Sequence, residues 1–318
     1  MGIRGSAIPA RLWESSLLRL PEKLISAHEE FLIEKTWRQD YAPANSGMIG
    51  GMAHDEAKEH VINRFLNSAA RMQYVCADPL DEQPEIRAML LEQMSDGSIE
   101  LLDLAAGNGS GTLAILSLLC ELRCEGLTPK FPVNIGILAV DYSINSLHFY
   151  SDLMSRIKPW LQSAGINVAL EVIYCDLAIP SELSDILDTF FENSKRRGIK
   201  RFLWTISALS GVKSDGMERL RDSLTQAAAR FGSKKINSSL LWVEPPPSNQ
   251  GWLNRMFETV QMTLKQLPHV FSRKKDSFEI TGEEYKISNA PLRKFSWFDP
   301  YNSKITVSRV MVANFRKE

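Results

Sequence analysis

The chain has 318 residues, of which 44% are hydrophobic and 24% are charged. This composition is that of a globular protein with a sizeable core, and it excludes a disordered, collagen-like or disulfide-stapled chain. The 37 basic and 38 acidic side chains nearly cancel, so no overall field attracts phosphate backbones and nonspecific nucleic-acid binding is not favoured.

Membrane spans and metal clusters are not expected. No apolar run reaches the ~18 residues that a membrane span needs, and the N-terminus lacks the apolar core of a signal peptide. The four cysteines do not form paired Cys-x-x-Cys motifs, so no metal site is expected and buried, unpaired thiols are favoured. We therefore expect a cytoplasmic protein.

Residues 1–96 predict a helical extension. Apolar residues recur at three- and four-residue spacing over 12–20, 22–37 and 55–74, which is typical of amphipathic helices. Between the last two lies the Gly- and Pro-rich stretch 40–52, which predicts a loop.

From residue 97 to 318, short apolar runs alternate with longer amphipathic stretches, the pattern of a parallel sheet covered by helices. The expected strands are 99–104, 135–140, 169–174, 201–206 and 239–243. The expected helices are about 111–123, 144–163, 181–195, 215–231 and 250–266. Segments 277–287 and 304–315 are rich in β-branched and aromatic residues and predict a closing antiparallel hairpin. We expect an α/β fold with a doubly wound, seven-stranded, mostly parallel sheet.

The first expected strand runs into a loop of small residues that opens the next helix. Asp103 stands near the strand's end, and the loop residues singled out are Ala105, Gly107, Asn108 and Gly109. Small residues let a ligand touch the backbone, and ligands of doubly wound sheets bind beyond the carboxyl ends of the strands. A dinucleotide fingerprint is incomplete, because Thr112 replaces its third glycine. A carboxylate at position 103 would repel a pyrophosphate and suit a ligand that carries an ammonium and a sulfonium.

This loop resembles the first motif of class I S-adenosylmethionine-dependent methyltransferases. Asp103, Gly107 and Gly109 match the motif, whereas Ala105 replaces its first glycine. The resemblance covers about residues 97–315 and implies S-adenosylmethionine as the cofactor. It further implies that Asp103 contacts the methionine amino group, directly or through water, and that the glycines approach the methionine and the ribose. A tight turn without a ligand is the alternative.

Two further acidic strand ends match the family. Asp141 ends the second expected strand, where the resemblance implies hydrogen bonds from both ribose hydroxyls, with Tyr142 lying along the adenine. Asp176 follows the third strand and is similar to the family's acidic residue near the adenine amino group, while Leu177 would offer its backbone N–H to the ring. The alternatives are that Asp141 caps a helix and that Asp176 begins a turn.

The resemblance implies acceptor-facing residues after the later strands and on an N-terminal lid formed by the extension. Lid candidates are Tyr41, Met48, Met52 and His54. His54 could act as a base near neutral pH, or be a surface histidine at a helix start. Glu244 ends the fifth strand before three prolines and could bind or deprotonate an acceptor, or simply lie at a rigid turn. Tyr41, His54 and Glu244 are therefore the catalytic candidates.

The acceptor is expected to be a small molecule or a protein side chain. Residues 204–211 lack the Asn-Pro-Pro-Tyr type motif of enzymes that methylate base amines, and no cysteine motif for activating pyrimidines is present. RNA is an alternative, because cations and aromatics in the expected hairpin connection could hold phosphates and stack bases: Arg293, Lys294, Phe295, Trp297, Phe298 and Tyr301. A non-catalytic interaction protein of the same fold is a second alternative. A nicotinamide dehydrogenase fits Asp103 and Thr112 badly.

Overall fold

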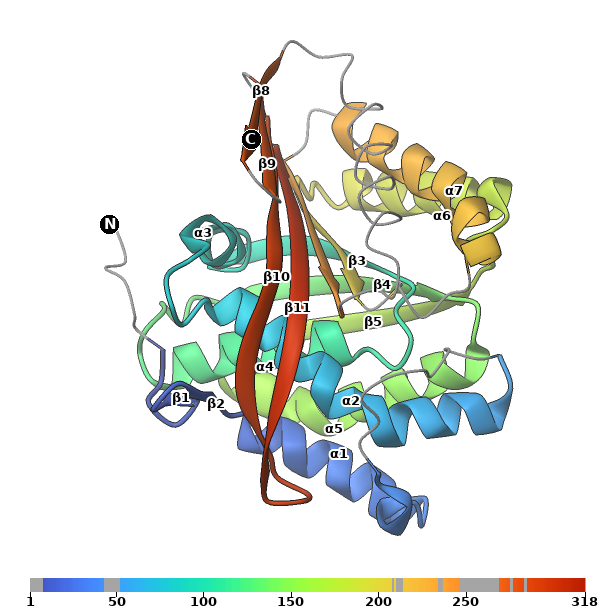
Figure 1. The fold of residues 1–318 in the computed structure, drawn as a ribbon. Coiled ribbons are helices and arrows are strands. Elements are labelled where there is room, and N and C mark those ends of the chain that lie inside the picture. Colours follow the sequence, from blue (N-terminus) through green and yellow to red (C-terminus); the bar gives the residue numbers. More distant parts are fainter. Residues whose placement is uncertain are drawn as a thin grey trace.

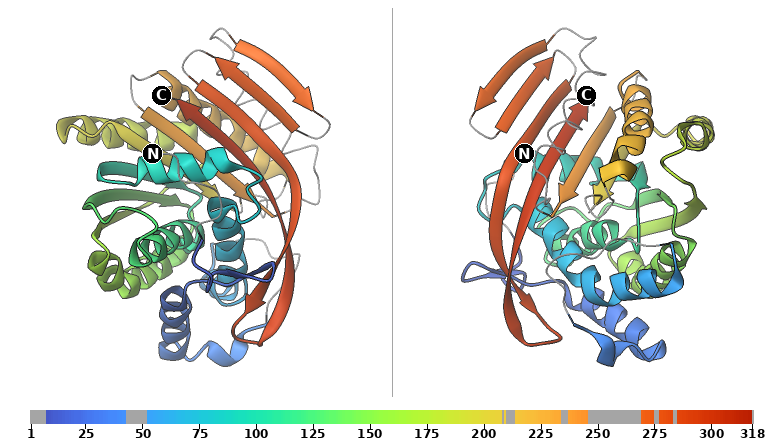
Figure 2. Two further views of the ribbon diagram at one scale, coloured as in Figure 1. Left: turned by 90° about the vertical axis from the view of Figure 1, so that its left-hand side faces the viewer. Right: turned by 45° about the vertical axis from the view of Figure 1, so that its right-hand side comes forward.

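The protein is built around one mixed β-sheet with helices on both faces (Figures 1 and 2). The computed structural model describes residues 8–42, 52–207, 209, 214–233, 237–245, 269–274, 277–282 and 285–317. Within them the sheet has 11 strands, in the order β1-β2-β10-β11-β7-β6-β3-β4-β5, with β9 pairing on β10 and β8 on β9.

Five neighbouring strands run parallel and form the centre of the sheet. They are β3 (Gly97–Leu104), β4 (Val133–Asp141), β5 (Ile166–Tyr174), β6 (Arg201–Ser207) and β7 (Asn237–Glu244). In β3, Leu101 is buried on one face and Leu102 on the other, which is why a parallel strand covered on both sides appears as a continuous apolar run. The five strands predicted for this region are confirmed.

Different helices cover the two faces of the sheet. Buried side chains of α2 (His54–Ala77), α4 (Ser110–Cys124) and α5 (Ile144–Ser163) belong to the core on one face of the sheet. Those of α6 (Pro180–Arg196) and α7 (Ser214–Ser233) belong to the core on the other face. The doubly wound arrangement and the four helices predicted between the strands are therefore confirmed. The helix predicted at 250–266 lies outside the described residues.

The N-terminal segment packs against the same core. α1 (Glu22–Glu34) lies on α5, and α2 lies on α4, so the two predicted helices are confirmed (Figure 2). A short 3₁₀ turn, η1 (Arg38–Asp40), follows α1. We did not predict α3 (Pro84–Gln93), although it begins with a proline, which is a helix-start signal. The division of the chain into 1–96 and 97–318 stays a prediction.

The helix predicted at 12–20 is wrong. The segment forms a small hairpin of β1 (Trp13–Glu14) and β2 (Leu17–Leu18). Ser15 and Ser16 between them have φ angles of 51° and 62°, in the left-handed region that a right-handed helix cannot contain and that tight hairpin turns favour. β2 pairs with β10, so tertiary contacts override the helical spacing of the leucines.

The C-terminal hairpin is longer than predicted. β10 (Tyr285–Asp299) pairs with β11 (Lys304–Lys317), and β11 runs antiparallel to β7. The segment predicted as 277–287 is two strands, β9 (Ser277–Gly282) and the start of β10, and β9 also pairs with β8 (His269–Lys274). Counting β1, β2, β8 and β9, the part of the sheet that the structure describes has 11 strands rather than the predicted seven.

The residues placed in the hairpin connection lie in β10 instead, except for Tyr301 in the turn. Phe295 and Trp297 are buried, Phe295 stacks on Tyr74 at 4.3 Å between ring centroids, and the Trp297 indole N–H donates to the Ser308 hydroxyl at 3.1 Å. Alternate residues of a strand face the same side, so these aromatics belong to the core rather than to a rim.

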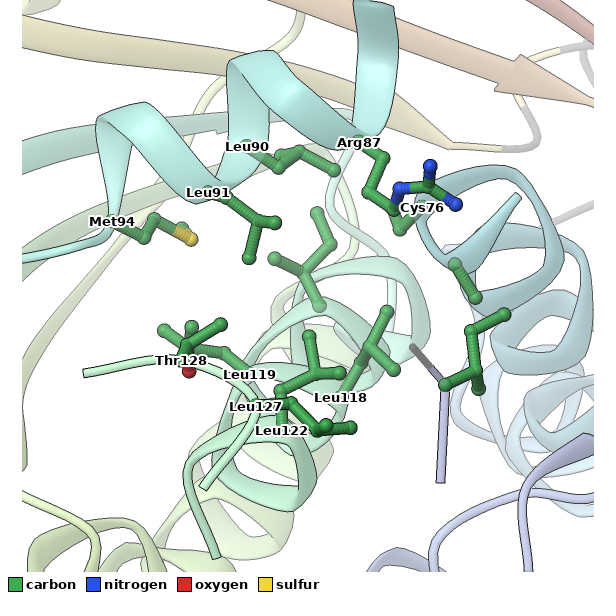
Figure 3. A pocket seen from close by; sticks show the side chains of 13 residues that line it. Cys76, Arg87, Leu90, Leu91, Met94, Leu118, Leu119, Leu122, Leu127 and Thr128 are labelled. Atoms are coloured by element: carbon green, nitrogen blue, oxygen red, sulfur yellow. The ribbon is translucent and has the colours of Figure 1, made fainter. Parts of the chain in front are cut away.

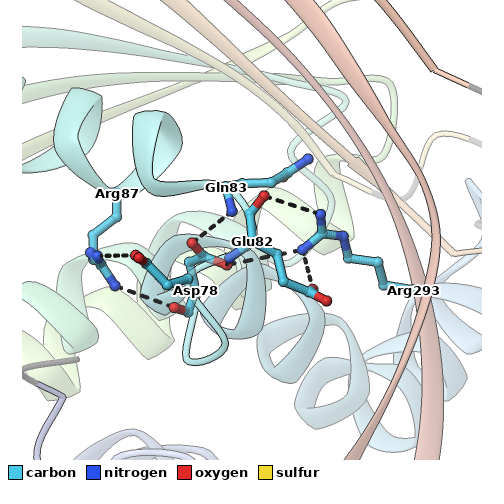
Figure 4. A network of polar contacts seen from close by, with 6 residues as sticks. Asp78, Glu82, Gln83, Arg87 and Arg293 are labelled. Carbon is cyan, nitrogen blue, oxygen red and sulfur yellow. Dashed lines mark hydrogen bonds and ion pairs between the residues drawn. The ribbon is translucent and has the colours of Figure 1, made fainter. Parts of the chain in front are cut away.

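Arg293 fastens β10 to the turn between α2 and α3 (Figure 4). Its guanidinium pairs with Glu82 and lies 4.0 Å from the Asp78 carboxylate. Asp78 accepts hydrogen bonds from the backbone N–H groups of Glu82 and Gln83, and Arg87 donates to the Asp78 carbonyl at 3.2 Å. The positive charge of Arg293 is thus already balanced by acidic neighbours.

A small apolar cavity of about 40 Å³ lies between the end of α2, α3 and α4 (Figure 3). Its lining includes Cys76, Leu90, Met94, Leu119 and Thr128. The Thr128 hydroxyl is buried and has no hydrogen-bond partner among the residues that the structure describes. A space of this size accommodates about one water molecule and leaves no room for an organic ligand.

Candidate functional site

The loop after β3 lies at the point in the sheet where the order of the strands reverses. From β3 the chain goes through β4 to the edge strand β5, then crosses back to β6 on the other side of β3. Ligands of doubly wound sheets bind beyond the carboxyl ends of the strands at such a point. The loop at 105–109, together with the end of β4, occupies this place.

The backbone of this loop is left-handed at alternate positions. Ala105, Gly107 and Gly109 have φ angles of 54°, 54° and 75°. A Cβ added to Gly109 would lie 2.1 Å from the Tyr150 ring, so glycine here lets α5 pack closely. A Cβ added to Gly107 would meet nothing within 4 Å. Gly107 is therefore the position at which a ligand can approach the loop backbone.

Asp103 is held inside the loop by two threonines. Its carboxylate accepts hydrogen bonds from the Thr112 hydroxyl at 2.7 Å and the Thr205 hydroxyl at 3.2 Å, and its side chain is fully buried. Burial raises the pKa of Asp103 to about 7, against the opposing effect of these hydrogen bonds. The carboxyl thus joins β3, β6 and α4, and its predicted contact with the methionine amino group stays a prediction.

Asp141 connects the end of β4 to the same loop. Its two carboxylate oxygens accept hydrogen bonds from the backbone N–H groups of Gly107 and Ser143, both at 2.8 Å. Burial raises the pKa of Asp141 to about 6, although the backbone donors oppose the shift. The Tyr142 backbone N–H is a third donor to this carboxylate. Two carboxylate oxygens offer about four lone pairs, so acceptor capacity for a ligand remains.

The third acidic strand end has a clear structural role. The Asp176 carboxylate accepts a hydrogen bond from the Ala178 backbone N–H at 2.9 Å, which begins the turn into α6. The Leu177 side chain is buried in the core below α6. Burial, with the charges of Asp141, Glu56 and Asp176, raises the pKa of Tyr142 to about 12. The predicted contacts of these residues with an adenine stay predictions.

The catalytic candidates contact different parts of the molecule. The Tyr41 hydroxyl donates to Asp299 at 3.1 Å, and burial raises its pKa. His54 is the exposed first residue of α2, with its ring edge-on to Phe149. Glu244 is buried and accepts hydrogen bonds at 2.7 Å from the Leu209 backbone N–H and the Trp242 indole N–H.

The lid prediction is only partly within the described chain. Met48 lies outside it, and Met52 is exposed, with its carbonyl accepting a hydrogen bond from Asn145 at 3.2 Å.

Among the described residues, no helix is both long enough and apolar enough to cross a bilayer.

No family model and no curated protein matches this chain. Several of the solved structures that it resembles are described as methyltransferases, three of them as dependent on S-adenosylmethionine. A putative class I enzyme from Listeria monocytogenes is 10% identical, with a TM-score of 0.36, over 93% of this chain and 79% of its own. Precorrin-6y C5,15-methyltransferase from Geobacter metallireducens is 12% identical, with a TM-score of 0.35, over 74% of this chain and 89% of its own.

A third similar structure is an S-adenosylmethionine-dependent methyltransferase from Clostridium acetobutylicum, 15% identical with a TM-score of 0.27, covering 77% of this chain and 79% of its own. Identities and TM-scores this low assign neither an activity nor an acceptor. The function must therefore come from the residues of the site.

The residues present fit S-adenosylmethionine. The loop offers open space at Gly107, and Asp141 keeps acceptor capacity beside it. The charge of Asp141 contributes to the raised pKa of Asp103, so the two buried carboxylates lie close enough to repel each other. A ligand with an ammonium and a sulfonium would relieve this repulsion, whereas a pyrophosphate would increase it.

One functional candidate was missed from the sequence. His60 of α2 reaches the loop at 105–109, which we call the cofactor loop, with its Nδ1 atom 3.3 Å from the Asn108 side-chain nitrogen. Burial, with the nearby charge of Arg64, lowers the pKa of His60 to about 4, so the imidazole is neutral at physiological pH. The available signal was the recurrence of basic residues at helical spacing on one face of α2, at His60, Arg64 and Arg71.

Proposed function

We propose that this protein transfers a methyl group from S-adenosylmethionine to an acceptor. The observation that carries the proposal is the pair of buried carboxylates, Asp103 and Asp141, near the carboxyl ends of adjacent strands at the switch point, beside the open backbone of Gly107. Their charges favour a cationic cofactor over a nucleotide with a pyrophosphate.

In this proposal the cofactor lies along the ends of β3, β4 and β5. Asp103 attracts the ammonium, and Asp141 accepts hydrogen bonds from the ribose hydroxyls. The residues around the adenine are Tyr142, Asp176 and Leu177. The cofactor supplies an activated methyl group. The chain then has to align the acceptor with the methyl–sulfur bond and exclude water, which lowers the barrier without a conspicuous base.

Isothermal titration calorimetry with S-adenosylmethionine and S-adenosylhomocysteine tests the cofactor. We expect Asp141→Ala to weaken binding by about 1–3 kcal/mol, because charge-assisted hydrogen bonds are lost. Asp141→Asn keeps the side-chain shape and serves if the alanine variant does not fold. Asp222→Asn, an exposed carboxylate on α7, is the matched control and should bind as the wild type does. Absence of heat with either compound at millimolar concentration would contradict the proposal.

We further propose a small-molecule or protein acceptor, in a cytoplasmic protein. The near-neutral charge balance, the balanced charge of Arg293 and the burial of Phe295 and Trp297 support this over RNA. Labelled methyl transfer to a cell lysate, with nuclease and protease treatments, separates the acceptor classes. Label that vanishes with nuclease and survives protease would indicate RNA, and cofactor binding without any labelling would favour a non-catalytic interaction protein.

A further inference from the structure

Helix α2 presents a row of basic side chains toward the carboxyl edge of the sheet. Residues 60, 64 and 71 are spaced by four and seven positions, which places them on one helical face. Both ends of the row have fixed neighbours: His60 contacts Asn108 of the cofactor loop, and the Arg71 side chain donates to the Arg309 carbonyl of β11 at 3.1 Å. Arg64 therefore lies on this face of α2 between the residue that contacts the cofactor loop and the residue that contacts β11.

The described residues balance the positive charge of this row only in part: the Glu59 carboxylate acts on Arg64 without forming an ion pair with it. No carboxylate of the described chain lies within ion-pair distance of the partly buried Arg64. The charge of Arg64 acts on both neighbours, contributing to the lowered pKa values of His60 and Arg71. Glu244 partly offsets Arg71, yet one of its oxygens is already occupied by two hydrogen bonds. Removing guanidinium groups from water without a counter-charge is costly unless an anion joins them.

We propose that Arg64, flanked by His60 and Arg71, binds a carboxylate next to the cofactor loop. The inference rests on the proposed function and specifies the recognition chemistry of the same site. Two carboxylates can arrive there, that of the methionine part of the cofactor and that of an acidic acceptor.

The local hydrogen-bonding groups suit this ligand. A guanidinium binds a carboxylate through two parallel N–H groups. With the Asn108 amide donating to Nδ1, the neutral His60 ring carries its proton on Nε2 and can donate it to a ligand oxygen. In the cofactor, the ammonium and the carboxylate are held on one carbon. Asp103 on β3 and Arg64 on α2 would complement these opposite charges from the two sides of the loop.

Calorimetry on the full chain tests the cofactor source. S-adenosylhomocysteine carries the carboxylate, whereas 5′-methylthioadenosine keeps the nucleoside and sulfur and lacks the amino-acid part. If the cofactor supplies the carboxylate, Arg64→Met weakens S-adenosylhomocysteine binding roughly 10- to 100-fold and leaves methylthioadenosine binding unchanged. Arg64→Lys, which keeps the charge, should recover part of the loss. Arg221→Met on α7 removes an exposed arginine as the matched control.

Thermal unfolding with acetate or succinate tests the acceptor source. If the acceptor supplies the carboxylate, these anions raise the Tm of the wild-type protein saturated with S-adenosylhomocysteine, and Arg64→Met abolishes the rise without changing cofactor affinity. The inference is overturned if Arg64→Met matches Arg221→Met in both experiments. If the wild type binds neither nucleoside, the proposed function fails, and the inference is then decided by the effect of the anions on the unliganded protein alone.

Discussion

Ala105 is strained at the start of the cofactor loop. Its φ of 54° lies in the region where a Cβ is disfavoured by about 1–2 kcal/mol, which accounts for the glycine that the resembling family has at this position. The strain accompanies a backbone path that brings the Ala106 N–H to the Val140 carbonyl at 3.1 Å and so joins the ends of β3 and β4.

Ala105→Gly should raise the free energy of unfolding by about 0.5–1 kcal/mol. The relieved strain exceeds the entropy that glycine gains in the unfolded chain. Urea denaturation measures the change. Ala88→Gly, at an exposed position inside α3, is the control and should lower stability by about 1 kcal/mol. Equal losses in both variants would contradict the strain at Ala105.

The Thr128 hydroxyl at the apolar cavity, to which no described residue is hydrogen-bonded, gives a second stability prediction. Thr128→Val keeps the shape and removes a buried polar group without a partner, so stability should rise by about 1 kcal/mol. Thr112→Val is the counterpart, because its hydroxyl donates to Asp103 at 2.7 Å, and it should lower stability by about 1–3 kcal/mol. Denaturant midpoints of the two variants should move in opposite directions, and a shift in the same direction would refute the assignment.

The sequence locates Asp103, Gly107 and Asp141 because each follows a strand within a short, regular motif. It does not locate the partners of Tyr41 or Glu244. Tyr41 bonds a residue 258 positions away, and Glu244 bonds the backbone 35 positions earlier. Contacts of that separation depend on the tertiary fold, which local patterns do not encode.

At the scale of elements, His28 joins α1, α2 and the turn between β10 and β11. Its ring nitrogens lie 2.9 Å from the Val61 carbonyl and 2.9 Å from the Tyr301 hydroxyl, and the ring stacks on Phe65 at 4.4 Å. These partners satisfy a neutral imidazole that donates from Nε2 and accepts at Nδ1. Burial lowers the pKa of His28 to about 4.

This histidine should make the fold sensitive to acid. Its folded pKa of about 4 lies below the unfolded value, so its contribution is complete above about pH 6.5 and is lost as pH falls toward 4. Between pH 7 and 5, His28→Gln should lose about 2 kcal/mol less stability than the wild type. Chemical denaturation at both pH values measures this. His148→Gln, at an exposed position on α5, should keep the wild-type slope, and an unchanged slope in His28→Gln would contradict the prediction.

The elements predicted correctly are those whose pattern is set locally. Four of the parallel strands, β3, β4, β6 and β7, are short, mostly buried apolar runs, and the edge strand β5 alternates buried and more exposed residues. Ser143 caps the start of α5 by accepting the Ser146 N–H at 3.3 Å. The hairpin at 13–18 and the long β10 were not predicted, because their strands are stabilised by partners far away in the chain. Pairing register, rather than composition, determines those elements.

For the whole molecule, the acidic end of β4 and the basic face of α2 both contact the cofactor loop, Asp141 at Gly107 and His60 at Asn108. Burial raises the pKa of Asp103 to about 7 and that of Asp141 to about 6, so both carboxyls lose protons as pH rises from about 5 to 8. The site therefore becomes more negative at the strand ends in this interval, while Arg64 stays charged.

Affinity for S-adenosylmethionine should consequently increase with pH. The cationic cofactor binds the ionised carboxyls, so we expect roughly tenfold tighter binding at pH 8 than at pH 5.5. Asp103→Asn should flatten this dependence, whereas Asp222→Asn should leave it intact. Calorimetry at the two pH values measures the affinity for S-adenosylmethionine. A pH-independent affinity of the wild type would refute the role of the ionised carboxyls.

The position of β11 has a consequence for synthesis on the ribosome. This strand follows every other strand in the chain, yet it lies between β7 and β10 and connects them. Until it has emerged, both neighbours expose an open edge and β1, β2 and β10 have no route to the rest of the sheet. A nascent chain that stalls before residue 304 is therefore a substrate for chaperones, and the complete sheet forms only after β11 has been synthesised.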